Sequence, residues 1–353
     1  MKDVWSILGE SKKPIVLYGM GNGADKILSV FSSKGIEAAG VFASDGFARG
    51  NDFRGFKVES YAQVCERLDD FIVVMSFASS RAEVLENVCR IASEREFYIP
   101  DVPVTGGGLF DLDFVKSHAD SLRAAYDLLA DERSREVFEL CVMAKLTGRL
   151  DFMLDSADPE ETVWQDILRP RRYHAYVDCG AYTGDTVRQI VGYSQIQRIW
   201  ALEPDRRSYA KLCACLEELD IPHRAENRAA WNCRTTLSFD DGAGRGASIS
   251  QKGKKEIGTM TVDELTDGAR VDYVKYDVEG AEAEALCGSA ETIARSSPDL
   301  RVALYHRPED IFALVLQVHE MLPGHKLFIR RQKSVPTWDV DLFAIGEKKM
   351  NNE

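Results

Sequence analysis

The stretch YVDCGAYTGDTV (residues 176–187) holds two glycines four residues apart, shortly after an aspartate near the end of an apolar run. A dinucleotide pyrophosphate usually requires three glycines, G-x-G-x-x-G, because the backbone must close on the phosphates. Here Tyr182 lies midway between Gly180 and Gly184, and its side chain would obstruct so close an approach. We therefore predict a nucleoside ligand that lacks phosphate. The loop residues expected to contact it are Asp178, Gly180, Ala181, Tyr182, Thr183, Gly184, Asp185 and Thr186.

Further polar side chains follow the next apolar runs of the same region. Glu203, in ALEPD, comes roughly twenty residues after the glycine loop, where a carboxylate can accept both ribose hydroxyls. Asn227, in AENRAAW, is expected to contact an adenine edge. YDVEG supplies Asp277 and Glu279, and YHRPED supplies His306. Together these features describe a site for S-adenosylmethionine, with Asp277 counted among the cofactor contacts.

Asp277, Glu279 and His306 are the predicted catalytic residues. Methyl transfer from a sulfonium to a hydroxyl requires alignment of the hydroxyl behind the methyl and removal of its proton. His306 is an attractive base because its unperturbed pKa of about 6.5 suits neutral pH. Two alternatives stay open: a hydrogen bond at a strand end for the histidine, and contacts with a helix N-terminus for the carboxylates. We predict no metal ion, although two carboxylates and a histidine can hold a divalent cation.

The elements that position these residues alternate from Arg171 onward between apolar runs and helical patterns, which predicts a parallel sheet with its ligands at the carboxyl ends of the strands. Thr183, Asp185 and Thr186 stand where a helix begins, so they could hold the carboxylate of the ligand or cap the helix. HKLFIRRQ and DVDLFAIG lack a helix between them. We expect these two runs to pair antiparallel through the turn near SVPTWD.

The first hundred residues show a second alternation of the same kind, with VESYAQVCERL expected as one of its helices. YGMGNGADKIL offers Gly19, Gly21 and Gly23, with Ala24 in the place of the third glycine of G-x-G-x-x-G/A, and Asp45 ends the second expected strand. A nucleotide or nucleotide-sugar ligand is therefore one prediction for this region. The alternative is that the glycines serve tight packing of a strand against a helix.

The fold class predicted is α/β, with two Rossmann-like parallel-sheet domains joined by a helical segment. VPVTGGG marks a boundary, and strand signals are absent from Leu109 to about Pro170. We divide the chain into an accessory domain (1–107), a helical connector (108–170) and a second α/β domain (171–349). The helical block could also serve as a lid or as the contact of a homo-oligomer, and the sequence does not choose among these roles.

Composition limits the classes of partner. The chain has 353 residues, 45% hydrophobic and 29% charged, so two domains with ordinary cores are expected. A net charge of -13 argues against nucleic-acid binding, which needs clustered Lys and Arg. No apolar run approaches the roughly 20 residues that span a bilayer, and the start is a poor signal peptide. The eight cysteines are scattered, so we expect reduced thiols and a cytoplasmic protein.

Residues 171–346 resemble class I, S-adenosylmethionine-dependent methyltransferases, and specifically the FkbM family. The resemblance is carried by YVDCGAYTGDTV, ALEPD, VDYVKYDVEGAEAEAL and LRVALYHRPEDI. It implies a class I methyltransferase fold, with the antiparallel hairpin at its end, and methyl transfer to an oxygen. The acceptor that it implies is a small molecule with a hydroxyl, of the sugar or natural-product type. The first domain resembles Rossmann-like modules attached to sugar-modifying enzymes.

Two other functions remain open at the level of the sequence. One is an NAD- or nucleotide-sugar-dependent enzyme that uses the first domain, although no Tyr-x-x-x-Lys pair follows GMGNGA. The other is a non-catalytic binding protein with two degenerate Rossmann units. The intact set of Gly180, Gly184 and Glu203 beside Asp277 and His306 argues against the latter.

Overall fold

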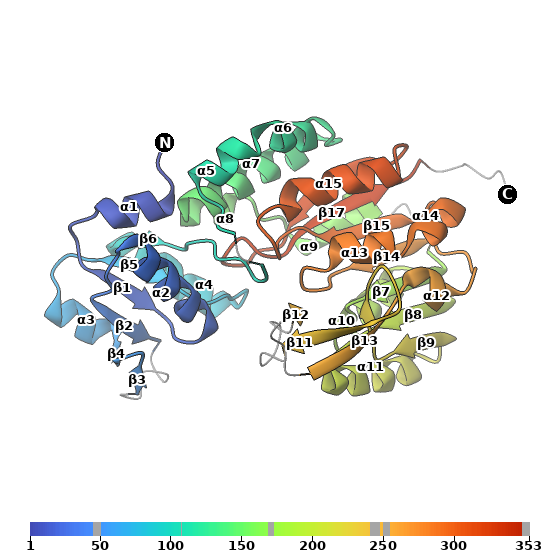
Figure 1. Cartoon of the computed structure of the whole chain (residues 1–353), viewed down its shortest axis with the longest axis horizontal. Coiled ribbons are helices and arrows are strands. Elements are labelled where there is room, and N and C mark those ends of the chain that lie inside the picture. The colour runs from blue at the N-terminus through green and yellow to red at the C-terminus, as the bar shows by residue number, and fades with distance from the viewer. Residues whose placement is uncertain (45–50, 107, 169–172, 241–247, 250–254, 348–353) are drawn as a thin grey trace.

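A computed structural model describes the chain except residues 45–50, 107, 169–172, 241–247, 250–254 and 348–353. Its described residues form two sheets of mainly parallel strands, each with helices on both faces, and a helical segment that lies against both (Figure 1). The predicted α/β class with two parallel sheets is confirmed. Asp45 and the predicted boundaries at 107 and 170 lie outside, or at the edge of, the described residues.

The first sheet has the strand order β3-β4-β2-β1-β5-β6. Three of its strands are fully buried apolar runs, as expected for parallel strands covered on both faces. The strands are β1 (Ile15–Tyr18), β2 (Gly40–Ala43), β3 (Asp52–Phe53), β4 (Phe56–Ser60), β5 (Ile72–Met75) and β6 (Glu96–Tyr98). The helices are α1 (Val4–Glu10), α2 (Asn22–Lys34), α3 (Tyr61–Arg67) and α4 (Ala82–Glu94). Among the strands that the structure describes in this sheet, β3 alone pairs antiparallel, with β4.

One predicted helix of this domain begins later in the structure than the sequence pattern predicts. The stretch VESYAQVCERL begins as the end of β4, because Val58 to Ser60 pair with β2 in parallel register. The helix α3 starts only at Tyr61, where the Ser60 side chain accepts the N–H of Gln63 in a capping box. The serine therefore separates strand from helix, and the preceding strand was too short and polar to be identified from its pattern.

The helical segment consists of α5 (Leu112–Ser117), α6 (Ala119–Asp127), α7 (Glu132–Thr147), α8 (Leu150–Asp155) and α9 (Glu160–Thr162), followed by a π-helical stretch (Val163–Leu168). Asp131 caps α7 by accepting the N–H of Ser134, and Gly148 ends it with φ 64°. Val137 and Phe138 share a buried core with the second sheet. Ala144 and Met153 belong to a core of the first sheet. The segment is thus packed against both sheets.

The second sheet has the order β16-β17-β15-β14-β7-β8-β9. Its strands are β7 (Ala175–Cys179), β8 (Arg198–Leu202), β9 (His223–Glu226), β14 (Tyr273–Tyr276), β15 (Asp299–Ala303), β16 (Lys326–Arg331) and β17 (Val340–Ile345). Its helices are α10 (Asp185–Tyr193), α11 (Arg206–Leu219), α12 (Val262–Thr266), α13 (Glu282–Cys287), α14 (Ala290–Ser296) and α15 (Asp310–Met321). The strand order reverses between β7 and β14, which is where such sheets bind ligands.

The terminal hairpin is confirmed, since β16 and β17 pair antiparallel from Lys326↔Ile345 to Arg331↔Val340. β17 lies between β16 and β15 and is antiparallel to both. A small separate sheet, in the order β10-β13-β11-β12, follows β9. It consists of β10 (Ala229–Ala230), β11 (Thr236–Asp240), β12 (Ser248–Ile249) and β13 (Lys255–Met260). The Gly- and Lys-rich stretch thus contributes to a hairpin in its described part.

The two domains meet through backbone contacts near the ends of β5 and β15. Ser79 and Val335 form an isolated antiparallel bridge, with N–H···O distances of 2.7 and 3.0 Å. The N–H of Thr105 donates to the carbonyl of His306 at 3.1 Å. Among the residues that the structure describes, none of the helices combines the length and apolarity that a membrane crossing requires.

Candidate functional site

A cavity of about 890 Å³ opens at the carboxyl ends of β7, β8, β14 and β15. It is lined from the second domain by the glycine loop, by the turn after β8, by the ends of β14 and β15 and by the loop before β17. Ala78, Ser79, Ser80 and Val104 of the first domain line it as well. The cavity volume is within the range of about 300–1,000 Å³ found for ligand pockets.

The glycine loop depends on two positions with φ near +80°. Gly180 has φ 81°, and a Cβ there would lie 1.8 Å from the carbonyl oxygen of Asp277. Gly184 has φ 85°, and a Cβ there would lie 2.6 Å from the sulfur of Cys215. Both glycines are therefore required for the loop to pack against β14 and α11. Tyr182, at φ 47°, has a half-exposed side chain, which agrees with a loop that does not close on phosphates.

Glu203 joins this loop to the turn after β8. One carboxylate oxygen accepts the N–H of Tyr182 at 2.7 Å, and the other accepts the N–H of Asp205 at 2.8 Å. Its side chain is buried at the cavity wall. Burial raises the pKa of Glu203 to about 7, although the two backbone donors partly oppose the shift.

Asp178 lies behind the loop and outside the cavity lining. It is fully buried and accepts hydrogen bonds from the hydroxyls of Tyr176 at 3.0 Å and Thr186 at 2.5 Å. Lys275, its register partner on β14, places Nζ 3.3 Å from the Asp178 carboxylate and 3.1 Å from the carbonyl of Gly180. The predicted direct contact of Asp178 with a ligand is thus replaced by a structural role: it holds the loop through neighbouring side chains.

The other residues predicted to contact the ligand fall into two groups: those that line the cavity and those that do not. Tyr182, Asp185 and Thr186 line the cavity with Gly180, whereas Ala181, Thr183 and Gly184 are not among its lining residues. α10 is capped by Gly184 without a side-chain hydrogen bond, so neither Thr183 nor Asp185 serves as the N-cap. Asn227 is exposed and donates its amide to the carbonyls of Glu203 and Pro204, at 2.8 and 3.0 Å. It also lies outside the lining, so its side chain supports the turn after β8.

Asp277 and Glu279 both face the cavity. Asp277 accepts the Tyr305 hydroxyl at 3.1 Å and lies 3.5 Å from the ammonium of Lys275. Burial opposes ionisation, but Lys275 and His306 together lower the pKa of Asp277. Glu279, at φ 56°, has a side chain that is 29% exposed and contacts His306 at 3.6 Å. Burial raises the pKa of Glu279 to about 7.

His306 was predicted as a base that contacts the acceptor hydroxyl, but its position in the structure contradicts that prediction. The ring is fully buried and does not line the cavity. Burial disfavours its charged form, but Glu282, Glu279 and Asp277 outweigh this and raise the pKa of His306 to about 10. At neutral pH the ring therefore carries a proton and cannot accept another.

Several cavity residues were not predicted from the sequence. Lys275 and Arg301 are charged residues inside otherwise apolar strands, and that departure from the pattern is the signal that could have revealed them. Tyr305 and Trp338 form an aromatic wall, with ring centroids 6.2 Å apart. Trp338 follows the hairpin turn and carries no local signal. The segment Ala78 to Ser80 belongs to the other domain and could not be assigned to this site from its sequence.

Gly19 and Gly23 of the first domain serve close packing. A Cβ on Gly19 would lie 2.4 Å from the Phe77 ring, and one on Gly23 would lie 2.0 Å from the carbonyl oxygen of Ser76. The turn after β1 thus rests directly against the segment after β5. Gly21 has φ 110° and caps α2. None of the three lines the cavity described above, and a ligand for this turn stays a prediction.

Comparison with known proteins shows what the second domain is similar to. Residues 178–331 match the family model described as the methyltransferase FkbM domain. The structure is similar to that of an FkbM methyltransferase from Methylobacillus flagellatus KT, at 17% identity and a TM-score of 0.73, covering 97% of this chain and 92% of that one. The similarity in fold therefore includes both domains.

Other solved structures match only part of the chain. An rRNA methylase from Streptococcus thermophilus is 12% identical, with a TM-score of 0.34, over 56% of this chain and 93% of its own. Fibrillarin from Aeropyrum pernix, solved with bound S-adenosyl-L-methionine, is 11% identical, with a TM-score of 0.33, over 54% of this chain and 74% of its own. No curated protein matches the chain in sequence.

Proposed function

We propose that this chain is an S-adenosylmethionine-dependent methyltransferase that methylates a hydroxyl oxygen of a small molecule. The match of residues 178–331 to the FkbM methyltransferase domain supports the proposal. The acceptor is of the sugar or natural-product type. The observation that carries the proposal is one cavity lined by Gly180, Glu203, Asp277 and Glu279. A cofactor-binding loop and carboxylates able to take a proton thus face the same space.

The cofactor fits the residues present on the β7 and β8 side of the cavity. Each carboxylate oxygen of Glu203 accepts one backbone N–H and has a further lone pair, so the pair can accept two ribose hydroxyls. The backbone of Gly180 approaches without a side chain in the way. The bound cofactor supplies the methyl group and a sulfonium that leaves readily.

On the acceptor side, Glu279 is the carboxylate available as a base. Asp277 already accepts the Tyr305 hydroxyl and lies beside Lys275, whereas Glu279 has only the longer contact with His306 among its described polar contacts. S-adenosylmethionine would supply the methyl group to the acceptor oxygen, and the electron pair of its carbon–sulfur bond would leave with sulfur. The hydroxyl proton passes to Glu279.

Titration calorimetry with S-adenosylhomocysteine, and separately with NAD, tests the cofactor. We expect micromolar binding of S-adenosylhomocysteine, weakened about 10- to 100-fold in Glu203→Ala, because a buried charged acceptor contributes about 1.5–3 kcal/mol. Glu320→Ala, at an exposed position on α15, is the matched control and should bind as the wild type does. Binding of NAD alone would point instead to an enzyme that works through the first domain.

The base is tested once an acceptor has been found by mass spectrometry of hydroxylated compounds incubated with enzyme and cofactor. Glu279→Gln is expected to slow methyl transfer by about 10²- to 10⁴-fold, the usual contribution of a positioned base. Its affinity for S-adenosylhomocysteine should stay within about threefold of the wild type, since the cofactor is held elsewhere. An unchanged rate would remove Glu279 from the reaction, and products methylated on nitrogen or carbon would refute the hydroxyl acceptor.

A further inference from the structure

The ring of His306 lies behind two carboxylates that face the cavity. Its Nε2 is 3.6 Å from an oxygen of Asp277 and 3.6 Å from an oxygen of Glu279. Both carboxylates line the cavity, whereas His306 is fully buried and does not. A separation of 3.6 Å is too long for a hydrogen bond but short enough for a strong attraction between opposite charges. The ring can therefore influence an acceptor only through Asp277 and Glu279.

A third carboxylate lies at the other edge of the ring. Nδ1 of His306 is 2.9 Å from an oxygen of Glu282, which is fully buried, and the same oxygen accepts the N–H of Val278 at 2.8 Å. Among the described residues, neither ring nitrogen has a partner with hydrogen-bond geometry, so charge joins the ring to its neighbours. Glu282 thus favours the charged form of the ring from the edge opposite Asp277 and Glu279.

The backbone around the ring and Glu279 is fixed by the first domain. The N–H of Thr105 donates to the carbonyl of His306 at 3.1 Å. The side chain of Thr105 also closes over Gly280, where a Cβ would lie 2.1 Å from its methyl carbon. Glu279, at φ 56°, is in the left-handed region, which a residue with a side chain seldom adopts unless its surroundings hold it there. His306 and Glu279 are therefore held in a defined relative position.

The charged groups that act on the ring come from three elements. They are Asp277 and Glu279 after β14, Glu282 on α13 and Asp310 on α15. Burial alone would lower the pKa of His306, but its carboxylate neighbours raise it to about 10, and Glu282 has the largest effect among them. The ring is therefore a buried cation at neutral pH.

This cation acts in turn on Glu279. Burial raises the pKa of Glu279 to about 7, and His306 is the strongest charge that opposes the rise. Asp277, Glu282 and Glu203 act in the other direction, because each of them repels a further negative charge. Loss of the charge on the ring would leave Glu279 mostly protonated at neutral pH. A protonated carboxyl group cannot take the proton of an acceptor hydroxyl.

We propose that His306 is a positioning residue, a fixed and buried cation that holds the carboxylate of Glu279 at the cavity wall as the base of methyl transfer. His306 exchanges no proton with the acceptor, so its effect on the reaction runs through Glu279. This role rests on the proposed function. The action of the ring on the ionisation of Glu279 needs neither cofactor nor acceptor, so the two can be tested separately.

Carbon NMR of the full-length protein, labelled with ¹³C at the glutamate carboxyl groups, measures the titration of Glu279 directly, and Glu279→Gln assigns its signal. In the wild type we expect a midpoint near pH 7. In His306→Gln the midpoint should rise by at least about 1 pH unit, since a carboxylate loses an opposite charge close to it. His223→Gln, at an exposed histidine outside the cavity lining, is the matched control and should leave the midpoint unchanged.

His306→Asn provides a second uncharged variant in case His306→Gln does not fold, as judged by circular dichroism. It should raise the midpoint of Glu279 in the same direction. An unchanged midpoint in either folded variant would overturn the proposal. Nitrogen NMR of the wild type gives a further test without any substitution: the ring of His306 should carry protons on both nitrogens at pH 7, and a neutral ring would also overturn the proposal.

The rate of methyl transfer separates positioning from a general loosening of the structure. In His306→Gln the rate at pH 7 should fall at least about fivefold and recover as the pH rises towards 9, because the ionisation of Glu279 has moved to higher pH. An equal loss at all pH values would contradict positioning. No methyl transfer by the wild type would refute the proposed function, whereas a raised midpoint of Glu279 would still support the action of His306 on this carboxylate.

Discussion

Both oxygens of the Glu203 carboxylate are occupied by backbone donors, yet the group lies at the wall of a cavity and its pKa is raised to about 7. Because burial raises this pKa above that of an unfolded glutamate, ionisation of Glu203 opposes folding. Protonated Glu203 stabilises the fold below about pH 4.5, and this contribution to the free energy of unfolding is lost as the pH rises through about 7. A ligand that donates two hydroxyls would stabilise the ionised form and offset this cost.

This linkage gives a prediction for cofactor binding. Between about pH 6 and pH 8, Glu203 changes from mostly protonated to mostly ionised in the free protein. Only the ionised group can accept both ribose hydroxyls while it keeps its two backbone donors, so the affinity for S-adenosylhomocysteine should rise with pH, by up to about tenfold per unit below the pKa. Calorimetry at several pH values measures this. In Glu203→Gln the affinity should be weaker and independent of pH; a slope that persists there would assign it to another group.

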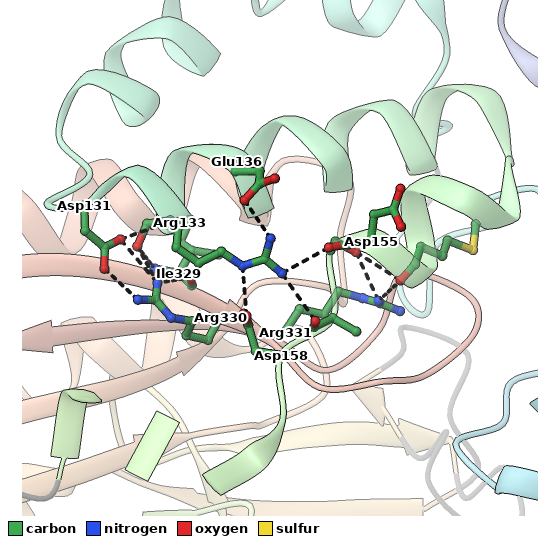
Figure 2. A network of polar contacts seen from close by, with 12 residues as sticks. Asp131, Arg133, Glu136, Asp155, Asp158, Ile329, Arg330 and Arg331 are labelled. Atoms are coloured by element: carbon green, nitrogen blue, oxygen red, sulfur yellow. Dashed lines mark hydrogen bonds and ion pairs between the residues drawn. The ribbon is translucent and has the colours of Figure 1, made fainter. Parts of the chain in front are cut away.

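At the scale of the elements, a row of arginines joins the helical segment to the second sheet (Figure 2). Arg330 pairs with Asp131 at 2.6 Å, and Arg133 pairs with Asp158 at 2.8 Å. Arg331 is different, because it is fully buried and donates to backbone carbonyls instead of carboxylates. Its acceptors are the carbonyls of Met153, Ser334, Pro336 and Trp338 and the hydroxyl of Ser156. This one side chain therefore holds the end of α8 against the loop that lines the cavity before β17.

Removal of Arg331 is expected to destabilise the whole protein. In Arg331→Met several buried carbonyls lose their donor, at about 1–3 kcal/mol each, so the free energy of unfolding should fall by at least about 3 kcal/mol in urea titrations. Arg331→Lys should recover little of it, because an ammonium cannot reach acceptors spread around a planar fork. The control is Arg123→Met, an exposed partner of Asp127, with a change below about 1 kcal/mol. Equal stability of Arg331→Lys and the wild type would contradict this account.

The elements also show which features of the fold could be predicted from the sequence. The strands that carry Gly180 and Glu203, and the antiparallel pairing of the last two strands, follow from apolar runs and motif spacing, which are local signals. The insertion of β17 between β15 and β16 is a pairing of distant segments and has no local signal. Asp178 and Asn227 were correctly predicted at strand ends. Whether such a side chain faces a ligand or a neighbouring residue depends on tertiary contacts. Asp178 contacts Thr186 and Lys275, and Asn227 contacts the turn after β8.

At the scale of the whole molecule, the cavity is a product of both domains. Val335, in the loop before β17, is fully buried in a hydrophobic core of the first sheet and bridges Ser79. On the other side, Thr105 fills the space above Gly280, where a Cβ would lie 2.1 Å from its methyl carbon. The first domain therefore supplies part of the wall of a site whose motifs all belong to the second. We therefore expect the first domain to help position the proposed acceptor.

Because residues of both domains line the cavity, a ligand bound to the second domain should protect backbone amides of the first domain from hydrogen exchange. In hydrogen exchange with and without S-adenosylhomocysteine, we expect slower exchange in peptides that cover residues 76–81, 103–106 and 332–339, because the ligand fills the space that these segments line and stabilises the bridge between Ser79 and Val335. Peptides from α3 (Tyr61–Arg67), remote from the cavity lining, should exchange at unchanged rates. Protection confined to residues 175–345 would show that the cofactor is bound without the first domain. The wall formed by Ala78 to Ser80 would then serve the acceptor alone, and an acceptor added with S-adenosylhomocysteine should restore protection there.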